Sequence, residues 1–365
     1  MLLAKSEKRV GWLNRVNGRA DPACCLIYNP PISMAATHKA LMELIRGIHN
    51  IKPRHRGCVL TIGNFDGVHQ GHHAVLVRLQ EKAVQLGLPA CVMLFEPQPL
   101  ELFAGNAAPA RLSRWREKYE ALKGMQIDRM LCVRFTHRFA EQAASTFIEQ
   151  LLVEKLGVHY LVVGDDFRFG KGREGDFHLL EEAGHRFGFE VISTQSFQVE
   201  RQRVSSTLVR EALKAGRMAE VELMLGRPYA ISGRVAHGDK LGRTIGFPTA
   251  NLALKRQVIP VGGVFAVEVL CSGKTFPGVA NVGVRPTLSG TQARLEVHLF
   301  DFSGDLYGQQ VKVLLRHKLR EEQKFASFTA LKEQIERDAL AARAWFGLPP
   351  FNLPSTLLEK KGTQD

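Results

Sequence analysis

The sequence contains no long apolar run and few aromatic residues. Its longest apolar run, residues 88–95, falls well short of the ~18 apolar residues that a membrane-spanning helix needs, so we expect a buried strand there. No secretory apolar segment is recognisable near Met1. Aromatic residues make up only 8% of the 365 residues, and no block of five or six basic residues occurs. These absences argue against a membrane-spanning protein and disfavour a nucleic-acid-binding protein.

The cysteines are also sparsely placed. They show no C-x-x-C spacing and no accompanying histidine pair at zinc-finger distances. Several lie in apolar segments, where cysteine behaves as a small hydrophobic residue. The six are Cys24, Cys25, Cys58, Cys91, Cys132 and Cys271. We therefore expect reduced thiols and a cytoplasmic location.

The formal net charge of +13 predicts an affinity for anions. Nucleic acid, an acidic membrane surface and phosphorylated small molecules are all compatible with that charge. Many arginines lie beside glycines, which suits phosphate contacts on small ligands, but the charge alone does not choose among the three.

The chain length suits two domains preceded by an extension. Residues 1–41 hold six Lys or Arg against two acidic residues and show no sustained periodicity. We expect a disordered extension, or a start assigned too early with Met42 as the working start; a targeting peptide is the alternative. The predicted domains are 42–226 and 227–346, with a tail at 347–365.

The first predicted domain alternates strand-like and helix-like segments. A helix is expected over residues 72–86, with Gly87 just beyond its end. Strands are expected at 58–62, 90–95, 129–133, 160–163 and 190–194. Such alternation is typical of a doubly wound α/β domain with a parallel sheet.

The second predicted domain is rich in short alternating strands. They are expected at 230–235, 264–270, 294–302 and 310–315. Ser272-Gly273 and Ser303-Gly304 are interpreted as hairpin turns, and a closing helix is expected from about Ser327. The pattern predicts a small antiparallel β-barrel.

The most informative segment is residues 63–72, GNFDGVHQGH, which follows a strand and opens a helix. Its glycines permit a tight turn, and the helix N-terminus offers free N–H groups to phosphate. His69 and His72 share a face of the first turn and can hydrogen-bond phosphate oxygens as a P–O bond breaks. Helix capping by the two histidines and a metal site are the alternatives. We favour phosphate binding, with Gly63, Asn64, Phe65, Asp66 and Gly67 as the binding turn.

The H-x-G-H pattern at 69–72 resembles that of the nucleotidyltransferase superfamily. A fuller set is similar to the prokaryotic bifunctional riboflavin kinase/FAD synthetase family, and it spans residues 42–346. Its motifs are 63–72, 95–99 (FEPQP), 164–170 (GDDFRFG) and 204–210 (VSSTLVR). Val204 and Val209 depart mildly from the family pattern, whereas Gln98 stands where many relatives have His, so no chemistry is assigned to it.

The resemblance implies an adenylyl-transfer site in the first domain. Asp166, Ser206, Thr207 and Arg210 are expected to contact the nucleotides, with the hydroxyls and the arginine holding the departing pyrophosphate. Plain N-capping would explain one of the two serines alone.

A glycine-rich basic loop at 233–251 suits the polyphosphate of ATP, although an ordinary barrel loop is the alternative. Its candidate ligands are Gly238, Lys240, Gly242 and Arg243. Residues 248–251, PTAN, resemble the riboflavin kinase signature, which implies that Thr249 and Asn251 help hold Mg²⁺.

Glu296 is the predicted general base of the kinase reaction. It shares one face of a strand with His298, and an exposed polar strand face is the alternative explanation. The family places an acidic residue here, and phosphoryl transfer needs a carboxylate to accept the ribityl hydroxyl proton. Residues 281–287 match the family's loop near the flavin, with Asn281 and Arg285 as binding candidates.

We therefore expect a bifunctional enzyme that phosphorylates riboflavin to FMN and adenylylates FMN to FAD, with ATP as co-substrate and Mg²⁺ as cofactor. Small molecules are its expected partners, without nucleic acid or membrane. The rivals are a single-activity enzyme with one degenerate module and a basic nucleic-acid-binding protein. The sequence does not predict an oligomeric state.

Overall fold

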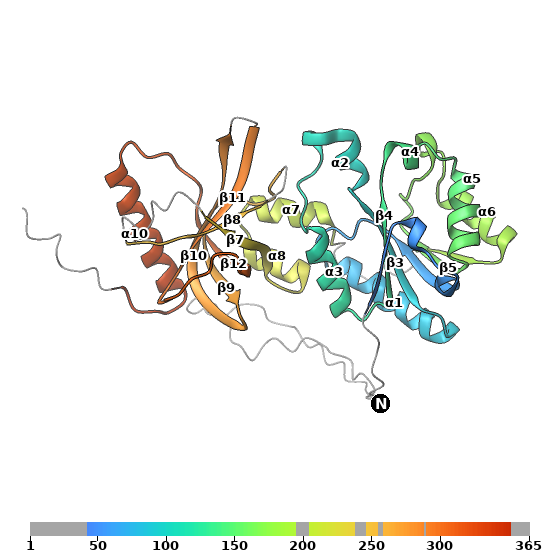
Figure 1. Ribbon diagram of the computed structural model, residues 1–365, viewed down its shortest axis with the longest axis horizontal. Helices are drawn as coiled ribbons and strands as arrows, with labels where there is room; N and C mark the ends of the chain where they lie inside the picture. The colour runs from blue at the N-terminus through green and yellow to red at the C-terminus, as the bar shows by residue number, and fades with distance from the viewer. Residues whose placement is uncertain (1–41, 195–203, 238–245, 255–257, 288–289, 352–365) are drawn as a thin grey trace, which may run out of the picture. The chain divides into compact units, whose positions relative to one another are not determined.

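The computed structural model describes residues 42–194, 204–237, 246–254, 258–287 and 290–351. Within them the chain forms an α/β domain with a parallel sheet, followed by a closed antiparallel barrel (Figure 1). The expected fold class is confirmed. The predicted extension at 1–41 and residues 352–365 of the predicted tail lie outside the described residues.

Six parallel strands form the sheet of the α/β domain, in the order β1-β4-β3-β2-β5-β6. Their bounds are β1 (Glu43–Arg46), β2 (Cys58–Ile62), β3 (Ala90–Glu96), β4 (Arg129–Arg134), β5 (Val158–Val163) and β6 (Glu190–Ser193). The five expected strands are all present. β1, where the sequence shows only the onset of regular patterning, pairs with β4 at one edge.

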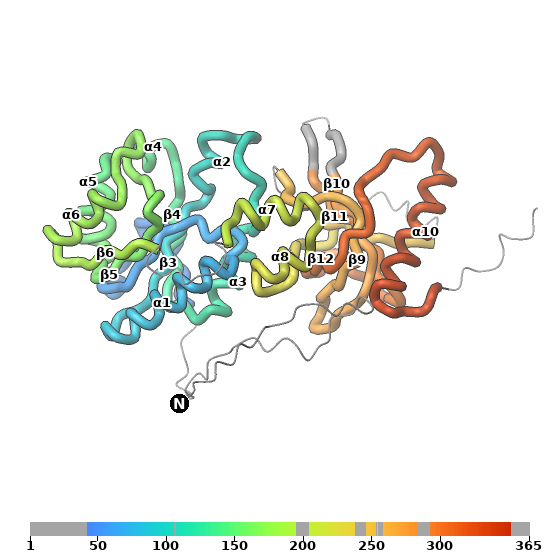
Figure 2. The backbone as a smooth tube through the Cα atoms, turned by 180° about the vertical axis from the view of Figure 1, so that it is seen from behind, coloured from blue at the N-terminus to red at the C-terminus, as the bar shows by residue number. Residues whose placement is uncertain are grey.

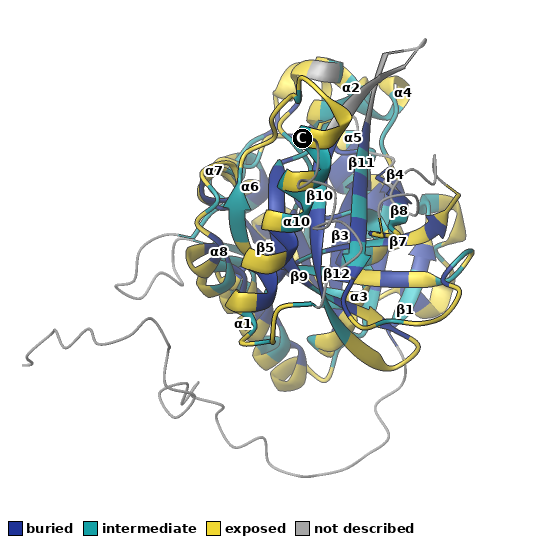
Figure 3. Ribbon diagram, turned by 90° about the vertical axis from the view of Figure 1, so that its left-hand side faces the viewer, coloured by how far each residue is buried: buried dark blue, intermediate teal, exposed yellow. Residues whose placement is uncertain are grey.

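The strands are apolar on both faces because helices cover both sides of the sheet. Cys58 and Leu60 of β2 belong to the core that includes η5 and α6, whereas Val59 belongs to the core that includes α1 and α3. The α- and π-helical segments before the barrel are α1 (Gln70–Leu86), α2 (Pro99–Ala104), α3 (Trp115–Gly124), α4 (His137–Ala140), α5 (Ala144–Thr146), the π-helical η5 (Phe147–Lys155), α6 (Phe177–Phe187), α7 (Ser206–Lys214) and α8 (Met218–Leu225). Short 3₁₀ turns lie at η2 (Ile48–Asn50), η3 (Pro53–His55), η4 (Gly105–Ala107) and η6 (Lys171–Arg173). Figure 3 shows the buried strands inside and the exposed helix faces outside.

The barrel is closed in the order β10-β11-β8-β7-β12-β9. Its strands are β7 (Tyr229–Ala236), β8 (Ala250–Ala253), β9 (Gly263–Cys271), β10 (Lys274–Thr287), β11 (Gly290–Leu299) and β12 (Gln310–Arg320). Helix α10 (Phe328–Trp345) packs Ala339 and Ala342 against it, and Ser327 caps the helix N-terminus as its predicted start requires.

Two expectations for the barrel are wrong, and a third strand has different bounds. Residues 281–287 are not a loop but the second half of β10. Pro277 and Pro286 make this strand hard to recognise in the sequence, because proline has no N–H to donate to a sheet. The strand predicted at 294–302 lies at Gly290–Leu299. Ser303-Gly304 does not make a hairpin, because β11 pairs with β10 and β8 while β12 pairs with β7 and β9. Ser272-Gly273 does join β9 to β10 as a two-residue hairpin, with both residues at positive φ.

Helices α7 and α8 connect the α/β domain to the barrel. Val221 and Leu225 of α8 share one apolar core with Ile231 of β7 and Val313 of β12. The chain can be followed from α7 through α8 into the barrel in Figure 2. The two helices therefore pack on the barrel core, although α7 carries the 204–210 motif of the first predicted domain.

Candidate functional site

A cavity of about 1430 Å³ lies at the carboxyl ends of the parallel strands. Gly63, which follows β2, and Gly164, which follows β5, both line it. Strands β2 and β5 are neighbours at which the strand order reverses, and ligands of doubly wound sheets bind at this switch point. The candidate site therefore lies at the end of β2, where the GNFDGVHQGH segment begins.

The two histidines of this segment build the start of α1. His69 is the N-cap: its Nδ1 accepts a hydrogen bond from the His72 amide at 3.4 Å, and the His69 amide donates to His72 Nδ1 at 3.3 Å. The rings stack with centroids 3.7 Å apart, and both line the cavity. Since each Nδ1 accepts, a neutral ring carries its proton on Nε2. Capping and ligand binding are thus compatible, because they use different ring nitrogens.

Both imidazoles are held in the neutral form. Burial is the main cause that lowers the pKa of His69 to about 4; Arg210 and Arg227 add to the effect, and Asp66 opposes it. The pKa of His72 is lowered well below its usual value by burial, then by His69, Lys118 and Arg227. At neutral pH the pair offers N–H donors without a positive charge.

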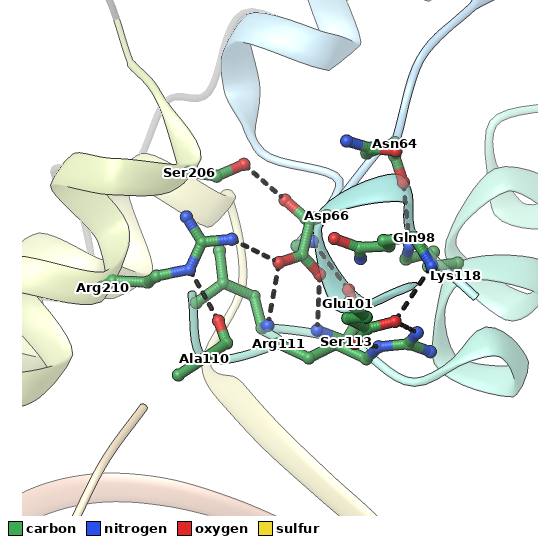
Figure 4. Close-up of polar contacts among 12 residues, drawn as sticks. Asn64, Asp66, Gln98, Glu101, Ala110, Arg111, Ser113, Lys118, Ser206 and Arg210 are labelled. Carbon is green, nitrogen blue, oxygen red and sulfur yellow. Dashed lines mark hydrogen bonds and ion pairs between the residues drawn. The ribbon is translucent and has the colours of Figure 1, made fainter. Parts of the chain in front are cut away.

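Asp66 lies behind the cavity lining. Its carboxylate accepts hydrogen bonds from the Leu112 and Ser113 amides, each at 3.0 Å, and from Arg210 at 2.7 Å (Figure 4). The Ser206 hydroxyl donates to the Asp66 carbonyl at 2.9 Å. Ser206 lines the cavity, but Asp66, Gly67, Thr207 and Arg210 are not among the lining residues. In this structure the Arg210 charge compensates Asp66, and the pair fastens α7 to the loop.

Lys118 is a second support of the loop, and the sequence analysis missed it. Its side chain is 0% exposed, and Nζ donates to the Asn64 carbonyl at 2.8 Å. Nearby, Arg111 pairs with Glu96 at 2.8 Å and with Glu101. The available signal was helical spacing, because Lys118 lies four residues before the buried Leu122 on the same stripe of α3.

Phenylalanines form much of the remaining wall, which the sequence analysis also missed. The rings of Phe103 and Phe135 meet edge to face at 6.0 Å, and Phe139 contacts Phe135 at 5.7 Å. All three line the cavity, as do Asn64, Phe65 and Asp166 from the predicted set. Scattered over three segments, the aromatic residues form no motif in the sequence. Together they offer an apolar face suited to a flat ring system.

The barrel brings three predicted residues into one cross-strand row. Glu296 of β11 lies opposite Asn251 of β8 on one side and opposite Asn281 of β10 on the other. The Asn281 amide donates to Glu322 at 3.2 Å, and His298 Nδ1 lies 2.9 Å from the Pro248 carbonyl. The row thus combines a carboxylate with two amides beside the PTAN segment.

Two other predicted barrel residues lie on or beside the strands of this row. Thr249 immediately precedes β8, and Arg285 lies on β10 opposite Gln292. The loop candidates Gly238, Lys240, Gly242 and Arg243 lie outside the described residues. Among the described residues, no group of three His, Cys, Asp or Glu side chains could hold a metal, and no helix could span a membrane.

Two family models match the chain in succession. A FAD synthetase model matches residues 51–208, and a riboflavin kinase model matches residues 225–346. With the switch-point cavity and the closed barrel, these matches define a two-domain enzyme of flavin nucleotide synthesis.

Curated relatives named bifunctional riboflavin kinase/FMN adenylyltransferase align along most of the chain. The Escherichia coli K12 protein is 60% identical over 84% of this chain and 99% of its own length. The Haemophilus influenzae protein is 55% identical, covering 84% and 99%, and the Pseudomonas fluorescens protein is 53% identical, covering 83% and 97%. The chain belongs to the bifunctional riboflavin kinase/FMN adenylyltransferase family. It phosphorylates riboflavin to FMN and adenylylates FMN to FAD, with ATP as co-substrate.

A solved structure gives the same architecture over both domains. It is named as a macrolide-efflux protein from Streptococcus pneumoniae, with a TM-score of 0.69 and 30% sequence identity. The match covers 84% of this chain and 100% of that chain.

Proposed function

We propose that the cavity at the sheet is the adenylyl-transfer site and that the row Asn251, Glu296 and Asn281 is the kinase site. One observation carries the first assignment: two neutral imidazoles meet the glycine turn and the start of α1 at the switch point. There an FMN phosphate oxygen attacks the α-phosphorus of ATP, the bond to the bridging oxygen breaks, and pyrophosphate leaves. The Nε2–H groups of His69 and His72 donate to the phosphate oxygens as charge develops.

The phenylalanine wall gives the flavin a place in this site. A flat tricyclic ring gains most from an apolar surface and from edge or face contacts with aromatic rings. Phe103, Phe135 and Phe139 provide such a surface at one part of the cavity lining, while the helix start provides phosphate donors at another. The cavity is large enough for two nucleotide-sized ligands, because drug-sized ligands occupy pockets of roughly 300–1,000 Å³.

In the kinase site Glu296 acts as general base. Its carboxylate accepts the proton of the terminal ribityl hydroxyl, whose oxygen bonds to the γ-phosphorus of ATP while ADP leaves. Cross-strand neighbours on both sides hold Glu296 in place, because β11 is an interior strand of the closed barrel. The candidate Arg285 and the basic loop at 238–243 would add phosphate contacts.

The barrel row fits Mg²⁺ as the cofactor of the kinase step. Thr249 offers a hydroxyl and Asn251 an amide oxygen, which are the donor types that a hard cation prefers. Asn281 Oδ1 is buried and has no hydrogen-bond partner among the described residues, so the row retains an oxygen for a ligand. The ion would neutralise charge on the transferring phosphate.

Two substitutions test the assignment of chemistry to domains. Glu296→Gln should lower FMN formation by about 10²–10⁴-fold while FMN is still converted to FAD. His72→Ala should lower FAD formation by about 10²–10³-fold while FMN accumulates. Mixing the two variants should restore FAD synthesis from riboflavin, because FMN can diffuse between them.

Matched controls separate chemistry from folding. His73→Ala removes the exposed neighbour of His72, and Glu268→Gln alters a carboxylate on β9 outside the row. Both should keep both activities. If Glu296→Gln blocks FAD formation from FMN and spares the kinase, the two sites are assigned to the wrong domains.

In this proposal the net charge of +13 serves to bind phosphorylated substrates, not nucleic acid or a membrane. A cytoplasmic location agrees with the unpaired thiols of Cys58, Cys91, Cys132 and Cys271. Salt-sensitive binding to random duplex DNA at micromolar concentration would contradict this role of the charge.

A further inference from the structure

Arg227 contacts the histidine-bearing loop from the start of the barrel region. It follows Gly226, the left-handed C-cap of α8, and is separated from β7 by Pro228. Its guanidinium donates to the Gly67 carbonyl at 2.6 Å, to the Val68 carbonyl at 2.9 Å and to the Leu225 carbonyl at 3.0 Å. One side chain thus ties the loop to the end of α8.

The two loop carbonyls belong to a strained turn. Gly67 has φ of 85° and Val68 has φ of 43°, a left-handed conformation that a β-branched residue rarely adopts. Such a conformation persists only where its surroundings impose it. His69, the N-cap whose ring enters the cavity, is the next residue. The orientation of the histidine pair therefore depends on what holds this turn.

A second contact from β7 reaches the same place. The Tyr229 hydroxyl donates to the Leu112 carbonyl at 3.0 Å, while the Leu112 amide donates to Asp66. A Cβ at Gly67 would lie 2.9 Å from Leu112 Cδ1, so the loop packs closely on this residue. The first residues of the barrel region therefore support the turn both directly and through Leu112.

The charge of Arg227 also reaches both rings. Burial lowers the pKa of His69 against the opposing effect of Asp66, and Arg210 and then Arg227 lower it further. Burial likewise lowers the pKa of His72, with additions from His69, Lys118 and Arg227. Burial lowers the pKa of Arg227 itself, and Glu117 opposes that shift. The guanidinium thus favours neutral imidazoles while it fixes the backbone beside them.

We propose that Arg227 is a positioning residue of the adenylyl-transfer site, supplied by the riboflavin kinase part of the chain. The FAD synthetase model ends at residue 208, and the riboflavin kinase model, which begins at residue 225, contains Arg227. The inference rests on the proposed role of His69 and His72. It makes adenylyl transfer depend on the junction of the domains, whereas the kinase row lies on other strands of the barrel.

The test compares Arg227→Gln and Arg227→Lys in the full chain, with Arg217→Gln as the control. Arg217 pairs with Glu220 at the exposed start of α8, and within the described residues its side chain makes no hydrogen bond or ion pair with the loop. Arg227→Gln should lower kcat/KM for FMN adenylylation by about 10–100-fold, because a shift of about 1 Å can cost 10²-fold. Arg227→Lys keeps the charge but loses the planar fork, so a smaller loss is expected. The kinase rate should stay within about twofold in all three variants.

A spectroscopic readout separates positioning from general destabilisation. The His69 pKa, followed by NMR titration, should rise from about 4 in Arg227→Gln and remain near that value in Arg227→Lys. A selective loss of adenylylation in either Arg227 variant, together with a raised His69 pKa in Arg227→Gln, supports the proposal. The absence of a selective loss in both variants, or an unchanged His69 pKa in Arg227→Gln, overturns it.

His72→Ala in the same assay identifies which statement fails. If His72→Ala keeps full adenylylation, the proposed function of the histidine pair is wrong and so is the role of Arg227. If His72→Ala is inactive while both Arg227 variants adenylylate FMN at the control rate, only the positioning role is wrong.

Discussion

Acidification should destabilise the α/β domain through His69. The folded-state pKa is about 4, whereas an exposed histidine titrates near 6.5. Between these values the unfolded chain binds more protons than the folded one, so stability is complete above pH 6.5 and falls as the pH drops toward 4. The linkage relation gives a loss of about 2 kcal/mol at pH 5 and about 3 kcal/mol at pH 4.

The matched variant is His69→Asn, which keeps a side-chain acceptor at the N-cap but cannot titrate. Urea unfolding of both proteins at pH 7.5, 6, 5 and 4, followed by a probe in the α/β domain, gives the difference in free energy of unfolding. Between pH 7.5 and pH 5 the free energy of unfolding of the parent protein should fall by about 2 kcal/mol more than that of His69→Asn. His72 is present in both proteins, so its contribution to the pH dependence largely cancels in the difference. A difference that does not change with pH would refute the burial argument for His69.

Three further predictions concern the ends, the junction and the barrel. A chain beginning at Met42 should make FAD at nearly the full rate, because residues 1–41 lack an apolar face to bury; a large loss of either activity would contradict this. A fragment beginning at Val204 should unfold at a higher temperature than one beginning at Glu222, since only the longer one keeps Val209 and Leu213 against the barrel core; equal midpoints would count against that packing. His298→Ala removes the contact between His298 Nδ1 and the Pro248 carbonyl, which is worth about one hydrogen bond. It should raise KM for ATP in the kinase step by about 5–10-fold and leave FMN adenylylation unchanged. His317→Ala, which removes a ring stacked on Trp345, is the control.

Local patterns predicted the adenylyl-transfer region well because strand, turn and helix follow one another within 30 residues. Cys58–Ile62, the glycine turn and α1 all lie where periodicity and capping place them. Lys118 was missed because a charged residue on a helix is normally assumed to face water, and its partner is the Asn64 carbonyl, 54 residues away. Arg227 was missed for the same reason: no local pattern reports contacts with Gly67 and Val68.

The barrel was predicted less well because its register is non-local. β10 contains two prolines and two glycines, so its composition resembles a loop, and only pairing with β9 and β11 makes it a strand. The same pairing sets Asn281 beside Glu296. The strand alternation predicted the face that Glu296 occupies, but not its neighbours on either side.

The buried Lys118 offers a way to observe the enzyme opening. A fully buried amine reacts with acylating reagents only when local opening exposes it, whereas an exposed lysine such as Lys171 reacts readily. Acylation of Lys118, detected by mass spectrometry of the digested chain, therefore measures how often the support under Asn64 is released. If substrates bind in the cavity as proposed, and only while Lys118 holds Asn64, they should slow this labelling in proportion to their saturation. The labelling rate of this one lysine would then report occupancy of the proposed adenylyl-transfer site in the unmodified sequence.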